Sequence, residues 1–320
     1  MIRKLLRSLT FAAIAALPMQ ALPTQVLAAD KLTVLLDWFV NPDHAPLFVA
    51  LDQGYFADEN LEVELIAPAD PNDPPKLVAA KQAEIAISYQ PQLHLQADRG
   101  LPLVRIGTLV ATPLSTILTL ADGPVKNVAD LKGKTVGFSV SGTEEAVLGA
   151  VLRSVGLTLD DITLVNVNFS LSPSLASGKV DAVVGAYRNF ELTQMDLIGK
   201  KGRPFFIEEH GVPPFDQLIY VAHKDSIGDP RLRRFLAAVE KGTQYLINHP
   251  QESWDIFRAK RPELNDELNR RAWFDTLPRF AHRPAAMDNA RYDRFARFLL
   301  EAKLIREIKP VSSYAVELPY

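Results

Sequence analysis

The segment Leu35–Pro46 (LLDWFVNPDHAP) places five chemically versatile side chains directly after an apolar run that is typical of a buried strand. They are Asp37, Trp38, Asn41, Asp43 and His44. Two carboxylates, an amide, an imidazole and an indole could serve acid–base catalysis, metal binding or ligand binding. Zinc is disfavoured, because adjacent residues such as Asp43 and His44 rarely direct both side chains at one ion. A polar turn without a function is the remaining interpretation.

Polar and aromatic residues gather in the same way after three further strand-like runs. The four groups are Asp37/Trp38/Asn41/His44, Ser88/Tyr89/Gln90, Ser141/Gly142/Thr143/Glu144 and Tyr187/Asn189/Glu191. Ligands favour the carboxyl ends of sheet strands and the interfaces between domains, so groups at strand ends favour a binding site. The first two groups lie in the first lobe of the predicted fold and the last two in the second lobe.

The residue types in these groups predict what the site would bind. Flat faces for a planar ring come from Trp38, Tyr89 and Tyr187. Hydrogen-bond partners in the plane of that ring come from Asp37, Asn41, Asn189 and Glu191. The backbone of Ser141, Gly142 and Thr143, at a predicted helix start, could hold a negative or oxygen-rich group. A sulfonate or phosphate site would favour arginine, and the groups contain only Arg188. A neutral or cationic aromatic ligand with amino substituents is therefore favoured.

Each of these residues also has a purely structural interpretation. Trp38 could be a core residue, and Glu191 could be a solvated carboxylate favoured by the dipole of its helix. His44 could cap a helix or be a half-buried imidazole with satisfied hydrogen bonds. Ser141 or Thr143 could be only the N-cap of the helix that follows. The functional interpretation depends on the joint placement of the groups, since no single residue requires it.

The sequence lacks the motifs of common catalytic and metal sites. The stretch GFSVS, Gly137–Ser141, comes close to the nucleophile elbow G-x-S-x-G, but Ser141 occupies the position of the final glycine. No H-E-x-x-H, G-x-G-x-x-G or P-loop lysine motif occurs. The six histidines are dispersed without metal-ligand spacing. We therefore expect no catalytic residue, no resident metal and no cofactor.

Strand-like and helix-like runs alternate twice along the chain, which predicts an α/β protein with two lobes and a cleft between them. After LIYVAHKD, helices are predicted over residues 230–248, 250–259, 263–276 and 284–303, and this helix-rich part is expected to pack on lobe one. We assign residues 29–121 plus 222–320 to lobe one and residues 122–221 to lobe two. The chain would cross between lobes near Leu120–Gly123 and Gln217–Val221. One large domain is compatible with the same pattern.

Residues 1–28 have the order of a secretory signal peptide. Its parts are the basic residues Arg3, Lys4 and Arg7, an apolar run from Leu9 to Leu17, and small residues at a cleavage site near Ala28 or Ala29. The apolar run is too short to span a bilayer, which favours cleavage over a retained anchor. The chain has no cysteine, which suits an oxidising compartment and excludes a lipid-modified cysteine. We therefore expect a periplasmic protein that is not integral to the membrane after cleavage.

The charge of the chain argues against nucleic acid as a partner. Its 320 residues carry a formal net charge of −3, and losing the three basic side chains of residues 1–28 brings it to −6. A mildly acidic exported protein is a poor candidate for binding nucleic acid. The basic stretches Arg231–Phe235 and Arg291–Phe298 alternate with apolar residues at helical spacing, so we interpret them as solvated helix faces.

Four stretches resemble one known family. They are LDWFVNPDHAPLFVALDQGYFADENLEVELI, PADPNDPPKLVAAKQAEIAISYQPQ, GFSVSGTEEAVL and VDAVVGAYRNFE. Over roughly residues 31–300, the chain resembles the periplasmic substrate-binding proteins that deliver a thiamine pyrimidine precursor to an ABC importer. The ligands of that family are formylaminopyrimidine and hydroxymethylpyrimidine compounds. The resemblance implies the type II periplasmic-binding-protein fold, a cleft that closes about a hinge, and a permease as partner.

The same resemblance implies roles for individual residues. Trp38 and Tyr89 would flank the pyrimidine, and Glu191 would be the best candidate for its aminopyrimidine edge. Further stacking or ring hydrogen bonds would come from Asp37, Asn41 and Tyr187. Single stretches recur in binders of sulfonates, taurine and flavin precursors, which leaves a flavin precursor or a sulfonate as the alternative cargo.

The fungal pyrimidine synthase of thiamine biosynthesis shares this fold and looks similar around His44, where it has a histidine. That enzyme consumes its own histidine and a lysine-bound pyridoxal phosphate, with iron. The position of its cofactor lysine reads Ser88 here, and the segment of its cysteine-rich motif reads GVPPFDQ, Gly211–Gln217. A signal peptide would also separate the chain from cytosolic pyridoxal phosphate. We therefore expect a binding protein and not an enzyme.

Overall fold

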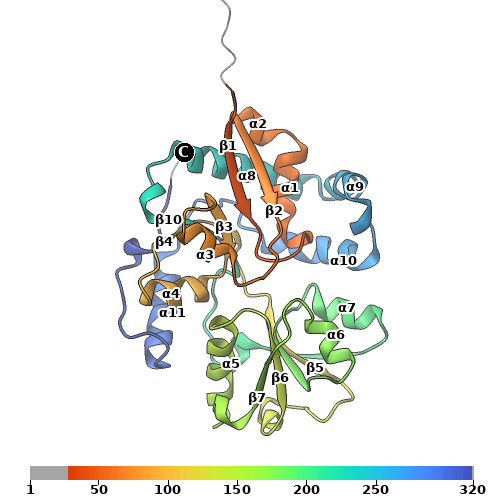
Figure 1. Cartoon of the computed structure of the whole chain (residues 1–320). Helices are drawn as coiled ribbons and strands as arrows, with labels where there is room; N and C mark the ends of the chain where they lie inside the picture. Colours follow the sequence, from red (N-terminus) through yellow and green to blue (C-terminus); the bar gives the residue numbers. More distant parts are fainter. Residues whose placement is uncertain (1–27, 319–320) are drawn as a thin grey trace, which may run out of the picture.

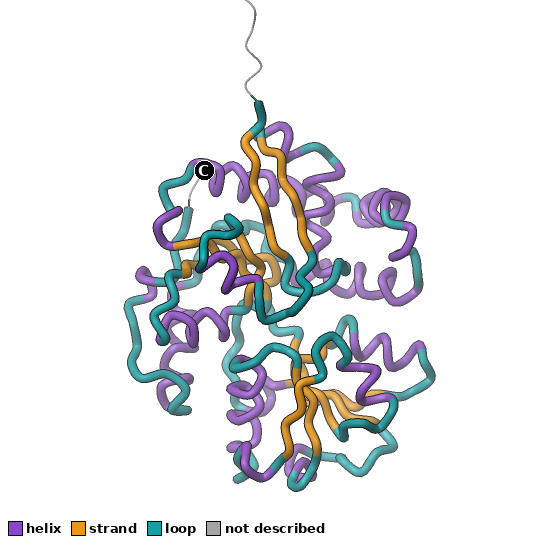
Figure 2. Tube along the Cα trace, viewed as in Figure 1, coloured by secondary structure: helices purple, strands orange, loops and turns teal. Residues whose placement is uncertain are grey.

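A computed structural model describes residues 28–318 as two lobes, each built around a five-stranded sheet (Figure 1). Helices flank both groups of strands (Figure 2). The expected α/β class with two lobes is confirmed. The expected signal peptide lies outside the described residues, apart from its last residue, Ala28. Within residues 28–318, no helix is long and apolar enough to cross a membrane.

The sheet of lobe one has the strand order β2-β1-β3-β10-β4. Its strands are β1 (Asp30–Leu35), β2 (Leu61–Ile66), β3 (Ile85–Ser88), β4 (Leu103–Val110) and β10 (Leu218–His223). β1 pairs in parallel with β2 and β3, whereas β10 pairs antiparallel with β3 and β4. β3 and β10 are buried along their whole length, as expected for central strands that are covered on both faces.

The sheet of lobe two has the strand order β7-β6-β8-β5-β9. Its strands are β5 (Ser115–Leu120), β6 (Thr135–Phe138), β7 (Thr163–Asn166), β8 (Ala182–Tyr187) and β9 (Gly202–Phe206). β6 pairs in parallel with β7 and β8, and β5 pairs antiparallel with β8 and β9. The helices of this lobe are α5 (Thr143–Arg153), α6 (Leu171–Ala176) and α7 (Glu191–Leu197).

Both crossings between the lobes differ from the assignment made from the sequence. β5 pairs within the second sheet and therefore belongs to lobe two, whereas the sequence assignment put it in lobe one. β10 pairs within the first sheet and belongs to lobe one. The chain thus crosses before each of these strands, at residues 111–114 and 211–217, and not near Leu120–Gly123 and Gln217–Val221. The apolar pattern of a strand does not show which sheet it joins, because its partners lie far away in the sequence.

The remaining helices belong to lobe one and to the C-terminal part. They are α1 (Ala45–Asp52), α2 (Tyr55–Asp58), α3 (Pro74–Ala79), α4 (Gln90–Asp98), α8 (Pro230–Asn248), α9 (Pro250–Lys260), α10 (Glu267–Thr276) and α11 (Asn289–Glu301). As expected, the helix-rich C-terminal part packs on lobe one, where α8 and α9 contact α1. α10 also contacts α7, and Phe295 of α11 shares a buried cluster with Leu148 of α5. The C-terminal helices therefore contact both lobes.

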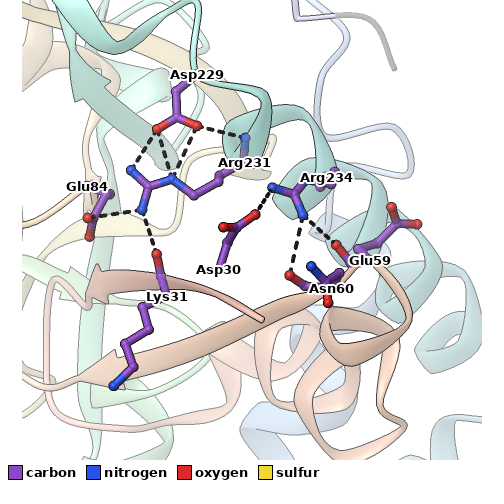
Figure 3. Close-up of polar contacts among 8 residues, drawn as sticks. All are labelled: Asp30, Lys31, Glu59, Asn60, Glu84, Asp229, Arg231 and Arg234. Atoms are coloured by element: carbon purple, nitrogen blue, oxygen red, sulfur yellow. Dashed lines mark hydrogen bonds and ion pairs between the residues drawn. The ribbon is translucent and has the colours of Figure 1, made fainter. Parts of the chain in front are cut away.

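Two arginines at the start of α8 hold the beginning of the first sheet (Figure 3). Arg231 donates to the backbone oxygen of Lys31 at 2.6 Å, and Arg234 donates to the backbone oxygen of Glu59 at 3.0 Å and to the Asp30 carboxylate. These bonds fix the N-terminal ends of β1 and β2 against the C-terminal part. The opposite ends of the strands, which carry the predicted site, are thereby set relative to α1 and α8.

Gly242 allows α8 to lie close against α1. A Cβ atom at this position would lie 2.6 Å from the backbone oxygen of Pro46 and 2.9 Å from the Cβ of Ala50. We expect Gly242→Ala to lower the free energy of unfolding by about 1–3 kcal/mol, because overpacking outweighs the better helix propensity of alanine. Urea denaturation would measure the change. Gly228→Ala, where a Cβ meets nothing within 4 Å, is the control. Equal stability of the two variants would contradict the close packing.

Candidate ligand-binding site

A cavity of about 750 Å³, partly open to solvent, lies between the lobes. Of the eleven residues predicted from the sequence, the structure brings eight to its walls, which are Asp37, Trp38, Asn41, His44, Tyr89, Thr143, Tyr187 and Glu191. The other three, Ser141, Gly142 and Asn189, do not line it. Contact of any of these residues with a ligand stays a prediction.

The aromatic walls come from both lobes. Trp38 follows β1 and packs edge-on against Phe169 of lobe two, with ring centroids 4.5 Å apart. Tyr89 follows β3, and Tyr187 ends β8. The Tyr187 hydroxyl accepts a hydrogen bond from Nε2 of Gln217, which lies on the second crossing segment, at 3.1 Å. Trp38 packs against a buried cluster of lobe two, as a core residue would, and it also lines the cavity.

Asp37 is held by two side chains of its own lobe. Its Oδ2 accepts from the Tyr89 hydroxyl and its Oδ1 lies on His44 Nε2, each at 2.9 Å. The backbone N–H of Asn41 donates to His44 Nδ1 at 3.4 Å, so the proton of a neutral imidazole sits on Nε2 and points at Asp37. His44 is fully buried, and its ring orients the carboxylate. Asn41 caps the short turn Pro42–His44 by accepting from the Asp43 N–H at 2.8 Å.

Asn189 bridges the two lobes instead of facing the cavity. Its Nδ2 donates to Asp43 Oδ1 at 2.6 Å and to the hydroxyl oxygen of Thr276, on α10, at 2.7 Å. The Thr276 hydroxyl lies 2.9 Å from the same Asp43 oxygen. Asp43 lines the cavity although the sequence analysis did not select it for the site. The sequence could not predict this contact, because Asp43, Asn189 and Thr276 come from three distant segments.

Ser141 takes part in a second contact between the lobes, and Gly142 comes directly before the first residue of α5. The Ser141 backbone N–H donates to Asn72 Oδ1 at 2.8 Å, and Asn72 Nδ2 donates to the backbone oxygen of Ser139 at 3.1 Å. Asn72 belongs to lobe one, so its amide joins the two sides of the cleft. Gly142 precedes α5 with φ +84°, a conformation that favours glycine.

Glu144 is a site residue that the sequence analysis left out of its selection, although it belongs to the Ser141–Glu144 group. The backbone N–H of Ser139 donates to its Oε2 at 2.6 Å. Gly185, in the left-handed region at φ +87°, makes room for this carboxyl, because a Cβ there would overlap it. Glu191 is bound in a similar way, since its Oε2 accepts from the Tyr187 N–H at 2.7 Å. Four carboxyl groups therefore share the cavity, those of Asp37, Asp43, Glu144 and Glu191.

Burial gives three of these carboxyl groups raised pKa values. It raises the pKa of Glu144 from 4.5 to about 8 and that of Glu191 from 4.5 to about 7. It also raises the pKa of Asp43 from 3.8 to about 6. None of the described residues that line the cavity is lysine or arginine. The cavity therefore suits a ligand that presents hydrogen-bond donors or positive charge, and it disfavours an anion.

We expect the ligand-free protein to lose stability as the pH rises from about 5 to about 8. Unfolded glutamates release their protons near pH 4.5, whereas folded Glu144 and Glu191 keep theirs to about pH 8 and about pH 7. Between these values the folded state binds more protons, so raising the pH favours unfolding. Thermal unfolding across this pH range would measure the slope. Glu144→Gln stays neutral and should flatten it above about pH 7, whereas the exposed control Glu301→Gln should not. A Glu144→Gln slope equal to that of the wild type would contradict the burial of Glu144.

Comparison with known proteins identifies relatives of this chain. A family model described as "NMT1/THI5 like" matches residues 41–253. The "Putative thiamine biosynthesis protein" of Haemophilus influenzae is 50% identical over 292 residues, which cover 91% of this chain and 93% of that protein. The "Formylaminopyrimidine-binding protein" of Halalkalibacterium halodurans is 32% identical over 243 residues, 75% of this chain and 74% of that protein. The 4-amino-5-hydroxymethyl-2-methylpyrimidine phosphate synthase of Uromyces fabae is 27% identical over 256 residues, 76% and 75% of the two chains.

Solved structures of similar shape agree with the two-lobed architecture. The alkanesulfonate-binding protein SsuA from Xanthomonas axonopodis pv. citri matches with a TM-score of 0.70 at 14% identity, over 89% of this chain and 97% of that one. A Candida albicans protein described as having the generic periplasmic binding protein fold matches with a TM-score of 0.72 at 18% identity, over 92% and 97%. Identities this low show the fold alone. The chain therefore belongs to the NMT1/THI5-like family and has the two-lobed fold of the periplasmic binding proteins.

Proposed function

We propose that the protein is the solute-binding component of an ABC importer and captures an aminopyrimidine precursor of thiamine in the cleft between its lobes. One observation carries the proposal: aromatic side chains and four carboxyl groups line a cavity whose described lining includes no lysine or arginine. An aminopyrimidine presents flat faces, an amino group and basic ring nitrogens, so it complements each of these features. The similarity to a formylaminopyrimidine-binding protein supports the same ligand class.

In the proposed complex, Trp38 and Tyr89 flank the ring and Glu191 binds its amino edge. Glu191 keeps one oxygen on the Tyr187 N–H. The cost of burying its charge raises its pKa in the empty site. Burial removes the water that would otherwise donate hydrogen bonds to the carboxylate. An amino group and a protonated ring nitrogen would replace those donors, and charge-assisted hydrogen bonds of this kind are among the stronger ones. Asp37, fixed by His44 and Tyr89, offers a second acceptor from the lobe-one side.

A sulfonate is a poorer match to this cavity, although the fold neighbours include an alkanesulfonate-binding protein. A sulfonate needs several hydrogen-bond donors or an arginine. Arg188, the one arginine in the sequence groups, pairs instead with Glu208 through two hydrogen bonds of 2.8 and 2.9 Å. Asp43, Glu144 and Glu191 would repel an anion whenever they ionise.

The synthase alternative requires a lysine to hold pyridoxal phosphate. Ser88, where the resemblance to that enzyme implies the lysine, is fully buried and donates to Gln92 at 2.8 Å. His44, where the resemblance to that enzyme implies a histidine, has both ring nitrogens in contact with protein groups. We therefore favour binding without covalent chemistry. The signal-peptide pattern of residues 1–28 supports export, and a permease would receive the ligand when the cleft opens.

We expect formylaminopyrimidine and hydroxymethylpyrimidine to raise the unfolding temperature of the purified protein, because a ligand that binds only the folded state stabilises it by mass action. A thermal-shift panel would compare them with thiamine, riboflavin, taurine and pyridoxal phosphate. A shift with one of the other compounds and none with either pyrimidine would overturn the assignment. Near-ultraviolet absorption of an aldimine after addition of pyridoxal phosphate would favour the synthase alternative.

Glu191→Gln should weaken pyrimidine binding about 5- to 30-fold, because it removes a charge-assisted hydrogen bond while keeping the size of the side chain. Isothermal titration calorimetry would give the affinity, and a circular dichroism melt would show that the variant still folds. Glu209→Gln, which neutralises an exposed carboxyl group of the same lobe, is the control and should bind as the wild type does. Undiminished affinity of Glu191→Gln would remove Glu191 from the site.

A further inference from the structure

Arg291 of α11 joins the two segments through which the chain crosses between the lobes. Its Nη1 donates to the backbone oxygen of Ala111, on the first crossing segment, at 2.8 Å. The same guanidinium pairs with the carboxylate of Asp216, on the second crossing segment. Asp216 is buried and is also held by lobe one, since its N–H donates to Gln90 Oε1 at 2.7 Å and its Oδ2 accepts from the Thr108 hydroxyl at 2.8 Å. One side chain of α11 therefore fixes both crossings.

α11 also packs into the buried clusters of both lobes. Tyr292 lies in a cluster with Val221 of lobe one. Phe295, further along the same helix, lies in a cluster with Leu148 of lobe two. Separating α11 from either lobe would expose apolar surface to water, which is unfavourable. A motion between the lobes that keeps both contacts must therefore leave α11 close to the axis of rotation.

Contacts of a different kind join the lobes on the side away from α11. In the view of Figure 1, α11 lies to the left and α7 and α10 lie to the right. On the right-hand side, Asn189 of lobe two donates to Asp43 at 2.6 Å and to Thr276 of α10 at 2.7 Å. Water can replace these hydrogen bonds when the surfaces separate, whereas it cannot replace the apolar contacts of α11. The lobes should therefore separate at Asn189 before they separate at α11.

We propose that the lobes rotate about α11 and that the hydrogen bonds of Asn189 hold them closed when no ligand is bound. Opening breaks both bonds of the Asn189 amide, and water then binds Asp43 and Thr276. Arg291 keeps the two crossing segments together throughout the motion. Neither Asn189 nor Arg291 lines the cavity, so both act on the position of the lobes without touching a ligand. The motion does not depend on which ligand the cavity holds.

Three distances test the position of the axis, because a point on a rotation axis keeps its distance from every point of both lobes. The chain has no cysteine, so cysteines introduced in pairs carry nitroxide labels at the chosen places only. Suitable substitutions at exposed positions are Glu64→Cys on lobe one, Lys179→Cys on lobe two and Arg294→Cys on α11. Double electron–electron resonance would measure the distance within each pair of labels.

Asn189→Ala should open the lobes, because it removes both hydrogen bonds of the amide. We expect the ratio of open to closed molecules to rise about tenfold. The distance between the labels on the two lobes should lengthen, whereas the distances from the α11 label to each lobe should stay nearly constant. Asn166→Ala removes an exposed amide that bonds within lobe two, and this control should change none of the three distances.

A double variant tests the role of Arg291. Arg291→Met together with Asp216→Asn removes the link between the crossing segments without leaving an unpaired charge buried. We expect the distance from the α11 label to lobe two to spread over a broader range, because the two crossings then move independently. Arg297→Met changes an exposed arginine of the same helix that pairs with Asp293, and this control should leave the distance unchanged.

Each outcome supports or overturns the inference. A wild type whose lobe-to-lobe distance already exceeds that of the structure overturns it, as does an Asn189→Ala variant with an unchanged distance. Equal changes in the lobe-to-lobe distance and in the distance from α11 to lobe two would put the axis elsewhere. Wild-type distances in the double variant would remove Arg291 from the pivot, and the distances in Asn189→Ala remain decisive if the double variant does not fold. None of these measurements uses a ligand, so a failure of pyrimidine binding would overturn the proposed function alone.

Discussion

Four carboxyl groups line one cavity, and none of its described lining residues is a lysine or an arginine. Hydrogen bonds from neighbouring residues hold these carboxyl groups in place. Asp37 receives hydrogen bonds from His44 and Tyr89, and Asp43 receives them from Asn189 and Thr276. Glu144 and Glu191 receive backbone N–H groups at the ends of β6 and β8. All four carboxyl groups nevertheless line the cavity, where a ligand can add hydrogen bonds to those that the protein makes. A ligand rich in donors completes these bonds, and this is the physical basis of the proposed specificity.

One of these contacts also holds the two lobes together. Asp43 of lobe one and Asn189 of lobe two meet at Thr276 on α10, so one buried contact joins the cavity, the far lobe and the C-terminal helices. Asn72 makes a second bridge to Ser139 and Ser141. Both bridges involve residues that line the cavity or are next to residues that do. The geometry of the site therefore depends on the relative position of the lobes.

Several features of the site could be predicted from the sequence because they are local. Asp37 and Trp38 follow a strand that ends at Leu35, and this places both near the carboxyl end of that strand in any fold that keeps it. Gly142 and the carboxylates that follow it indicate the helix start at Thr143. Glu191 lies in the first turn of its helix, where carboxylates are favoured. The C-terminal helices were predicted by their apolar spacing, and α8 spans residues 230–248 as expected.

The sequence by itself determined the alternation of elements, the polar groups at the strand ends and the ligand chemistry that their residue types favour. The tertiary structure decided which sheet β5 and β10 join, that Asn189 bridges the lobes, and that Glu144 faces the cavity opposite Gly185. The physical reason is the range of the interactions. Hydrogen bonding within a helix and the alternation of a strand depend on near neighbours in the sequence. Strand pairing, contacts between lobes and the burial of a carboxyl depend on segments that only folding brings together.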